Sequence, residues 1–326
     1  MRIKTILGLW KSTIGIKIFL GGMLLYANPA FSQQNGDIIE NIELKNFDDL
    51  IQYINNTESR DSIDLEKTRF EYLDKVKVYG ITYWSDNLKV KGFLLKPKKI
   101  GKYPVIIYNR GGSLDFGSLT HGAASIGLGE LAKIAHQGYV IAASQYRGNG
   151  GSEGQEEYGG SDINDVLNLI PLLESQKEVD INKLGMFGWS RGAMTTLLAI
   201  KQTKKVKAVV LGGPSTNLVR GIVDRPSLDE WWSTFIPNYN VSKEEVLKKR
   251  SAIYWVHELP KNVPMLIVQG ENDKALPVGY TLDFAKELSK HKVPFKLVKY
   301  EDGNHGLYKY QDEVFNELFN WFEKYL

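Results

Sequence analysis

Apolar residues form two alternating patterns along most of the chain. Short continuous apolar runs lie at 105–108, 139–143, 183–187, 208–211, 265–268 and 295–298, and stretches typical of helices lie at 128–136, 161–173, 192–202, 280–291 and 311–325. Strands that are buried on both faces have such continuous runs, and they are usually parallel. The alternation predicts an α/β fold, with a doubly wound, mostly parallel sheet and helices on both faces.

The residues before Pro104 have a different pattern. Between Thr68 and Lys98, aromatic and β-branched residues alternate with polar ones, and Asp86-Asn87 interrupts the alternation. A period of two predicts antiparallel strands, which we expect at the edge of the sheet. Segment 33–66 is polar and mixed, so we expect a short helical or loose lead-in there. The main domain is then expected to span 67–326.

One connection breaks the alternation of strands and helices. From Pro214 to Pro264 there is no pattern of a buried strand. A connection of this length in a compact domain usually has a function, such as that of a lid. We therefore expect a helical lid insertion at about 214–262. Its aromatic residues Trp231, Trp232 and Phe235 either line a pocket or pack the lid onto the core, and we leave them out of the predicted site.

The first 32 residues have the pattern of an export signal. A basic start without acids precedes the apolar run 18–27, and the small residues Ala30 and Ser32 stand before Gln33. This predicts a secretory signal peptide over 1–32 and a secreted or periplasmic protein. An uncleaved membrane anchor is the alternative, but a span needs about 20 apolar residues. The absence of cysteine excludes a bacterial lipid anchor.

Removing this segment changes the charge balance. The whole chain has 41 basic and 38 acidic residues, a net charge of +3, but four basic and no acidic residues lie in 1–32, which leaves −1. Nothing in that balance indicates a nucleic-acid partner, and we expect no stable membrane association after signal cleavage. The oligomeric state stays open.

The chain also carries few signs of a cofactor. Without cysteine, disulfides, thiolate catalysis and zinc–thiolate sites are impossible. The histidines are scattered, so we expect no metal site. Segment 148–154 is rich in glycine but lacks the Lys-Ser/Thr of a phosphate-binding loop, so we expect no cofactor.

A serine stands between two glycines in Gly188-Trp-Ser190-Arg-Gly192, after a predicted strand and before a predicted helix. This is the setting of the G-x-S-x-G nucleophile elbow. The sharp turn leaves no room for side chains at 188 and 192 and strains the serine, whose hydroxyl then lies at the carboxyl edge of the sheet. The helix N-terminus directs free N–H groups to the same place. Ser190 is the predicted nucleophile, and a structural serine is the alternative.

A serine hydroxyl needs a base, and in this arrangement the order along the chain is serine, acid, histidine. His257 lies in the irregular segment, His291 stands between lysines at a helix end, and His305 follows the last strand directly. Loops after the carboxyl ends of parallel strands build such sites. His305 is therefore the predicted base, and a solvent-exposed loop histidine is the alternative.

The acid must orient the histidine. Asp273 and Glu271 both follow a predicted strand, and we prefer Asp273 because the turn from Gly270 can carry it over the sheet edge. Glu271 is the second choice, and Asp302 is expected to form a turn. We interpret Asp162 and Asp165, at a helix start, as capping residues.

An oxyanion hole needs two N–H donors. The N–H of Arg191, after the nucleophile, supplies one, and Gly111, after the first parallel strand, is our choice for the other, with Arg110 second. The Arg110 side chain either binds a substrate carboxylate or forms a structural ion pair, of which we favour the ion pair.

Six segments resemble the catalytic domain of the prolyl oligopeptidase family of serine peptidases, which has the α/β-hydrolase fold. They are 103–112, 138–154, 159–170, 179–200, 264–278 and 302–306. The resemblance implies a nucleophile at Ser190, an acid at Asp273 rather than Glu271, and a base at His305. Two departures stand out. Asn109-Arg-Gly-Gly112 replaces the family's His-Gly-Gly, and the roughly 70 residues between the signal and Tyr103 are too few for its β-propeller, so we expect none.

The resemblance implies a serine hydrolase that cleaves peptide or amide bonds. The same residues can serve an ester hydrolase, for example one that removes an acyl group from a sugar. The expected partner is thus a small peptide or an acyl ester. A binding module on an inactive hydrolase scaffold is a third hypothesis, and the filled positions at 190, 273 and 305 oppose it.

Overall fold

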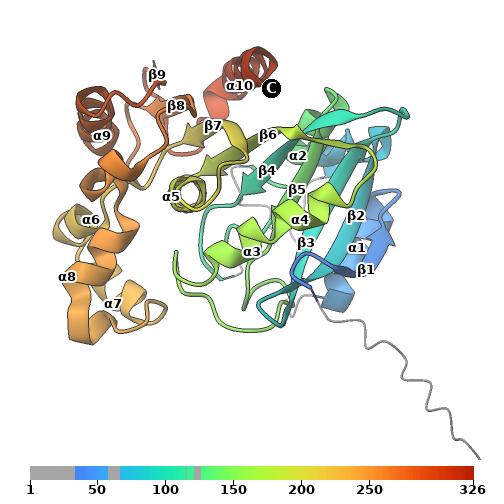
Figure 1. Ribbon diagram of the computed structural model, residues 1–326, viewed down its shortest axis with the longest axis horizontal. Coiled ribbons are helices and arrows are strands. Elements are labelled where there is room, and N and C mark those ends of the chain that lie inside the picture. The colour runs from blue at the N-terminus through green and yellow to red at the C-terminus, as the bar shows by residue number, and fades with distance from the viewer. Residues whose placement is uncertain (1–33, 58–66, 115, 121–125) are drawn as a thin grey trace, which may run out of the picture. The chain divides into compact units, whose positions relative to one another are not determined.

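The structure is a computed structural model that describes residues 34–57, 67–114, 116–120 and 126–326 (Figure 1). The predicted export signal lies outside the described residues. One sheet has nine strands in the order β1-β2-β3-β5-β4-β6-β7-β8-β9. The strands are β1 Ile38–Glu43, β2 Val76–Ser85, β3 Leu88–Pro97, β4 Tyr103–Asn109, β5 Val140–Ser144, β6 Val179–Trp189, β7 Val206–Gly212, β8 Met265–Gly270 and β9 Phe295–Tyr300.

The six strands from β5 to β9 in this order pair in parallel, and they contain the predicted apolar runs apart from Tyr139, which directly precedes β5. In β4, Val105 and Ile107 belong to one buried cluster and Ile106 and Tyr108 to another. Successive side chains point to opposite faces, so a strand covered on both faces must be apolar at every position. The predicted doubly wound α/β fold is confirmed.

Helices cover both faces of the sheet (Figure 1). Helices α3, α4, α5 and α9 contribute to one buried cluster, and α1, α2 and α10 to the other. The helices are α1 Phe47–Thr57, α2 Leu128–His136, α3 Ile163–Leu167, α4 Leu169–Glu174, α5 Arg191–Ile200, α6 Leu218–Asp224, α7 Ser227–Ser233, α8 Tyr239–Arg250, α9 Val278–Lys290 and α10 Gln311–Tyr325, and the 3₁₀ turns are η1 Lys67–Phe70, η2 Leu73–Lys75, η3 Ala252–Tyr254, η4 Val256–Glu258 and η5 Tyr308–Tyr310. None of the described helices has the length and apolar character to span a membrane.

The first three strands are antiparallel and differ from the prediction in one respect. Asp86 and Asn87 connect β2 to β3 with φ values of 52° and 63°, as a tight hairpin turn requires. Strand β1 pairs with the outer side of β2, and β3 pairs with β5, so the expectation that β2 and β3 form the edge is wrong. Strand β1 lies in the segment expected to be a lead-in, and its mostly exposed residues carry little hydrophobic pattern.

The stretch 161–173, expected as one helix, consists of α3 and α4, which meet at Asn168. Pro171 has no N–H to donate to the carbonyl of Leu167, which explains a break in this turn.

The connection from 214 to 264 is helical and contains α6, α7, α8, η3 and η4. Trp232, Tyr239 and Trp255 are buried in the cluster shared with α5, so they hold these helices on the core. Trp231 keeps 44% of its surface exposed. The aromatic residues of this segment therefore differ in burial: three pack against the core, and Trp231 is partly exposed.

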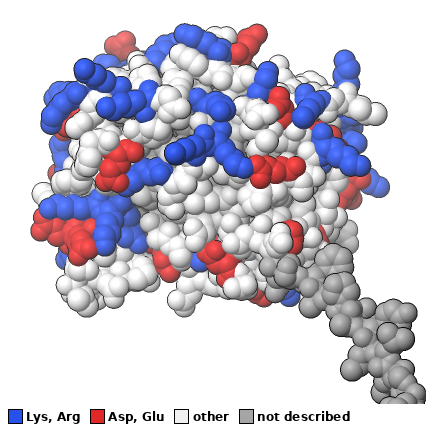
Figure 2. Space-filling view, in the orientation of Figure 1, with Lys and Arg blue, Asp and Glu red and all other residues white. Residues whose placement is uncertain are grey.

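Charged side chains are distributed over the surface with both signs present. On the face seen in Figure 2, acidic side chains lie among the basic ones. Surface pairs such as Lys133–Asp312 and Lys296–Glu317 contribute to this mixture.

Candidate active site

Ser190 lies on the sharp turn between β6 and α5, with φ 58° and ψ −121°. A Cβ on Gly188 would lie 2.2 Å from the carbonyl oxygen of Gly192, and a Cβ on Gly192 would lie 1.8 Å from that of Asn109. Only glycine fits at either position. The serine itself is in a backbone conformation that costs about 1–3 kcal/mol and is typical of functional sites.

His305 and Asp273 contact each other at the same edge of the sheet. The Nδ1 atom of His305 lies 2.7 Å from Oδ2 of Asp273, whose side chain is fully buried. The other carboxylate oxygen accepts hydrogen bonds from the N–H groups of Ala275 and Leu276, both at 2.8 Å. These donors hold the carboxylate in one orientation toward the imidazole.

Two glycines allow the loops after β8 and β9 to cross. A Cβ on Gly270 would lie 2.2 Å from the carbonyl oxygen of Gly303, and the N–H of Asn272 donates to that oxygen at 3.0 Å. This close approach brings Asp273 and His305 together from different loops.

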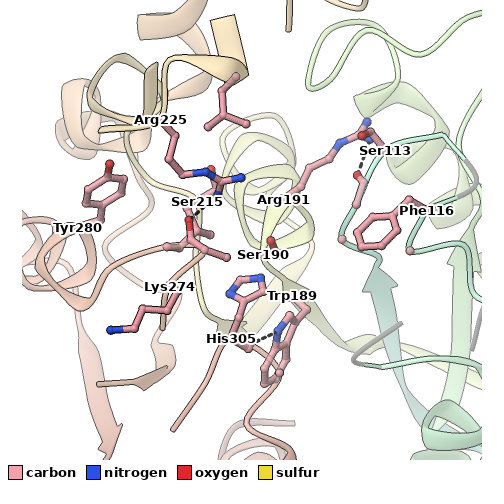
Figure 3. A pocket seen from close by; sticks show the side chains of 18 of the residues that line it. Ser113, Phe116, Trp189, Ser190, Arg191, Ser215, Arg225, Lys274, Tyr280 and His305 are labelled. Atoms are coloured by element: carbon pink, nitrogen blue, oxygen red, sulfur yellow. Dashed lines mark hydrogen bonds between the residues drawn. The ribbon is translucent and has the colours of Figure 1, made fainter. Parts of the chain in front are cut away.

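Several contacts hold the imidazole near Ser190. The Nε1–H of Trp189 donates to the carbonyl of His305 at 3.0 Å. The N–H of Ser190 donates to Gly212 at 2.7 Å, and a Cβ on the next residue, Gly213, would lie 3.2 Å from the His305 ring. Ser190 and His305 line the same cavity, and Figure 3 shows them beside each other.

The alternatives considered for acid and base lie elsewhere. Glu271 is exposed and forms an ion pair with Lys299. His257 and His291 lie near each other, with ring centroids 6.0 Å apart, and neither lines the cavity. Asp302 is exposed, with φ 56° in a turn.

The main chain after β4 passes next to the serine. A Cβ on Gly111 would lie 3.0 Å from the carbonyl oxygen of Trp189 and 3.2 Å from Cβ of Ser190. Among the described residues, no hydrogen bond uses the N–H of Gly111 or of Arg191. Both groups are therefore available to a ligand beside Ser190.

The Arg110 side chain has a structural role. It is fully buried and donates to the main-chain carbonyls of Gln145, Gly111 and Leu114. Its burial excludes the hypothesis that it binds a substrate carboxylate. The prediction named an ion pair as the structural role of Arg110, and it did not foresee these hydrogen bonds to main-chain carbonyls.

The Arg191 side chain forms the floor of the cavity. Its guanidinium lies 2.5 Å from Glu156 and 2.6 Å from Asp162, and it donates to the carbonyl of Gly112 at 2.9 Å. It also stacks on the ring of Tyr158, 4.5 Å from its centroid. Burial acts to lower the pKa of Arg191, but the two carboxylates outweigh it and raise that pKa above its ordinary value. The group stays charged and is held in place by these partners at the cavity.

These contacts correct the interpretation of two aspartates. Asp162, at the start of α3, makes no side-chain cap and pairs with Arg191. Asp165 is buried and lies 2.7 Å from Arg147. The prediction of caps rested on the position of both aspartates at a helix start. It missed the ion pairs because the two arginines come from other parts of the chain.

The cavity at Ser190 has a volume of about 840 Å³. Trp231 and Trp232, which we left out of the predicted site, line it together with Phe116, Tyr308, Arg225 and Lys274. Phe235 does not line it and instead contacts the ring of Trp231 at 5.1 Å. Aromatic residues in a long connection were the available signal for the two tryptophans. No local pattern distinguished Arg225 and Lys274 from other basic residues.

Within the described parts of the chain, no group of three or more histidine, aspartate or glutamate side chains is arranged to hold a metal ion.

Comparison with known proteins identifies similar sequences and similar folds. The uncharacterized peptidase YtmA of Bacillus subtilis is 28% identical over 243 residues, which are 74% of this chain and 91% of that protein. The structure is similar to that of acylaminoacyl peptidase from Pyrococcus horikoshii, with a TM-score of 0.67 and 20% identity over 80% of this chain and 44% of that one. It is also similar to acetyl xylan esterase from Paenibacillus sp. R4, with a TM-score of 0.60 and 18% identity over 86% of this chain and 93% of that one.

The two solved structures establish the α/β-hydrolase fold. The chain spans less than half of the acylaminoacyl peptidase but nearly all of YtmA. Residues 128–326 match the prolyl oligopeptidase family, and this match includes the turn at Ser190 and both loops that carry Asp273 and His305. Because the match covers more than half of the sequence, the chain belongs to the prolyl oligopeptidase family and is a serine hydrolase.

Proposed function

We propose that this protein is an exported hydrolase that cleaves peptide or amide bonds through an acyl-enzyme on Ser190. The observation that carries the proposal is the hydrogen bond between His305 and the buried Asp273 at the cavity that Ser190 lines. An imidazole oriented in this way is the base that a serine hydroxyl requires.

In the first half of the reaction, the Oγ atom of Ser190 attacks the substrate carbonyl while Nε2 of His305 takes its proton. Asp273 accepts the Nδ1–H bond and stabilises the imidazolium. The N–H groups of Gly111 and Arg191 donate to the oxygen that becomes negative. His305 then gives the proton to the leaving nitrogen, the carbon–nitrogen bond breaks, and the acyl group remains on Ser190.

In the second half, His305 takes a proton from water, and the oxygen of that water attacks the ester carbonyl. The same N–H groups stabilise the negative oxygen. The bond to Oγ breaks, Ser190 recovers its proton from His305, and a carboxylic acid leaves. No cofactor takes part in these steps.

The cavity supports a small substrate. Its volume of about 840 Å³ lies within the usual range for small-molecule sites, and aromatic side chains line much of it. A short peptide or a peptide terminus fits this size.

The test combines labelling and kinetics. We expect a fluorophosphonate to label the wild-type protein and not the Ser190→Ala variant, and we expect wild-type protein to hydrolyse peptide anilides. Absence of labelling in wild-type protein would instead support the inactive binding module.

Ester hydrolysis is the second proposal, because the fold is similar to an acetyl xylan esterase over nearly the full length of both chains. An ester has an oxygen leaving group, which needs less help from a proton donor than an amide nitrogen. Matched anilides and aryl esters with the same acyl group separate the two. Hydrolysis of the esters alone would reject the peptidase and retain the esterase.

Export is supported by the sequence of residues 1–32 alone. We propose a secreted or periplasmic enzyme without stable membrane association after cleavage. Expression of the full chain in a bacterial host, followed by fractionation and N-terminal sequencing, should give a soluble exported protein that begins at Gln33. A membrane-bound protein that still begins at Met1 would instead support an uncleaved anchor.

A further inference from the structure

One side of the Ser190 cavity carries basic side chains. Arg225 directly follows α6, and Lys274 follows Asp273 in the loop between β8 and α9. We call Arg225, Lys274 and Tyr280 the lid-side rim, and all three line the cavity. Figure 3 shows this rim on the opposite side of Ser190 from Ser113 and Phe116.

Both cations of the lid-side rim are exposed and have donors to spare. An Nη atom of Arg225 donates to the carbonyl of Ala275 at 3.0 Å, which positions the guanidinium. Within the described part of the chain, its other Nη and its Nε make no hydrogen bond, and neither does the ammonium of Lys274. A positioned guanidinium with a free edge can bind an acceptor without losing an existing partner.

The charges around the cavity are unbalanced. None of the described residues that line it is an aspartate or glutamate. Asp224 precedes Arg225, but its carboxylate accepts from the hydroxyl of Tyr280 at 2.7 Å and pairs with Arg220 at 3.3 Å. The Arg191 guanidinium also lines the cavity, but two buried carboxylates neutralise it. Among the described residues that line the cavity, the excess positive charge is therefore that of Arg225 and Lys274.

The charge of Arg225 reaches two walls of the cavity. Burial raises the pKa of Tyr158, and burial together with the Asp224 carboxylate raises the pKa of Tyr280 to about 12, while the charge of Arg225 acts in the opposite direction on both. Tyr158 comes from the loop before α3 and Tyr280 from α9, and both line the cavity together with Arg225.

We propose that the lid-side rim binds a carboxylate of the substrate, so that Ser190 acts preferentially on acidic peptides. Arg225 offers two parallel N–H donors, the arrangement that matches a carboxylate, and Lys274 adds a mobile positive charge. This inference rests on the proposed peptide hydrolysis. A substrate carboxylate was the less favoured of the two roles considered for Arg110, and the structure buries Arg110 while leaving Arg225 exposed at the cavity.

The experiment uses short internally quenched peptides in matched pairs. One pair differs only in a free C-terminal carboxylate against a carboxamide, and the other only in a glutamate against a glutamine side chain. These arms distinguish a terminal from a side-chain carboxylate. We expect wild-type enzyme to prefer the acidic member of at least one pair by about tenfold or more in kcat/KM, mainly through KM.

Variants assign that preference to the rim. Arg225→Gln and Lys274→Gln should each reduce the ratio of acidic to neutral rates, and the double variant should bring it close to one. Arg225→Glu combined with Lys274→Glu should favour a peptide with lysine in place of the glutamate. Lys261→Gln is the matched control, because Lys261 is exposed and does not line the cavity, and it should keep the wild-type ratio.

Equal rates on acidic and neutral peptides would overturn the proposal, and so would a preference that Lys261→Gln lowers as much as Arg225→Gln. If the proposed peptide hydrolysis itself is wrong, the result is distinguishable, because the enzyme then cleaves neither the acidic nor the neutral peptide. In that case, calorimetry on the Ser190→Ala variant decides. Tighter binding of the peptide acid than of its amide, lost in Arg225→Gln, supports the rim, and equal binding rejects it.

Discussion

On the floor of the Ser190 cavity, the guanidinium of Arg191 is 1% exposed and lies between Glu156 and Asp162. At the lid-side rim of the same cavity, the guanidinium of Arg225 is exposed and bound to one main-chain carbonyl. The same side chain thus meets opposite surroundings on two sides of one nucleophile.

The difference follows from the cost of taking charges out of water. A buried guanidinium is tolerated only where carboxylates and carbonyls replace the water, so the donors on the floor are occupied. A group at the rim stays hydrated and can exchange water for a ligand. Buried charges here maintain the architecture of the site, whereas exposed charges are the ones that can recognise a substrate.

The same contrast between a buried and an exposed charge predicts its largest effect for two acids in the loop after β8. Asp273 is buried against His305, and Glu271 is exposed. Asp273→Asn should lower kcat by about 10⁴-fold, because an amide neither holds the required tautomer nor stabilises the imidazolium. Glu271→Gln, the matched control, should stay within about twofold, because exposed pairs contribute little. Steady-state kinetics on a peptide anilide measures both, and the reverse order would assign the acid to Glu271.

The next effect concerns the stability of the floor. Arg191→Met should cost about 3–5 kcal/mol, because it leaves Glu156 and Asp162 as uncompensated buried charges. Arg220→Met is the control, since Arg220 pairs with Asp224 and Asp283 at the surface, and it should cost less than about 1 kcal/mol.

Urea denaturation measures both changes in the free energy of unfolding. Adding Glu156→Gln to Arg191→Met should restore part of the loss, because it removes one unpaired charge. Similar costs for Arg191→Met and Arg220→Met would contradict the distinction between floor and rim.

A smaller effect is expected where the main chain touches the imidazole. Gly213 has φ 45°, and an added Cβ would lie 3.2 Å from His305 and 3.5 Å from Oδ2 of Asp273. Gly213→Ala should lower kcat by about 10–100-fold by displacing the ring. Gly138→Ala is the matched control, because Gly138 also has positive φ, 96°, but open space around its Cα.

The Gly138→Ala variant should lose stability from backbone strain and keep its kcat. If both variants lose kcat equally, strain rather than contact with the imidazole is responsible.

The smallest effect concerns an aromatic side chain at the cavity. Trp231 and Tyr254 are each 44% exposed, but only Trp231 lines the cavity. Trp231→Ala should raise KM for an apolar substrate by about fivefold through loss of aromatic contact, with little change in stability. Tyr254→Ala should leave KM unchanged. A loss of stability without a change in KM for Trp231→Ala would show that this residue only packs the segment.

The residues at Ser190 illustrate what sequence alone could predict. Steric exclusion at Gly188 acts against Gly192, so the pentapeptide already contains that requirement. At Gly192 the excluded space is filled by the carbonyl of Asn109 on the adjacent strand β4, which the fold supplies. Continuous apolar runs predicted the parallel strands for a similar reason, because burial on both faces constrains every side chain. Position after a strand also selected Asp273 and His305 as candidates.

Other features depend on partners that are remote in the sequence, and only the tertiary structure decided them. Strand β1 is recognised by its pairing with β2, not by its own mostly exposed residues. Asp162 pairs with Arg191 instead of capping a helix, and Arg225 rather than Arg110 is open to the cavity. Local sterics and burial are encoded within a few residues, whereas the role of a charge depends on which groups replace its water, and these come from elsewhere in the fold.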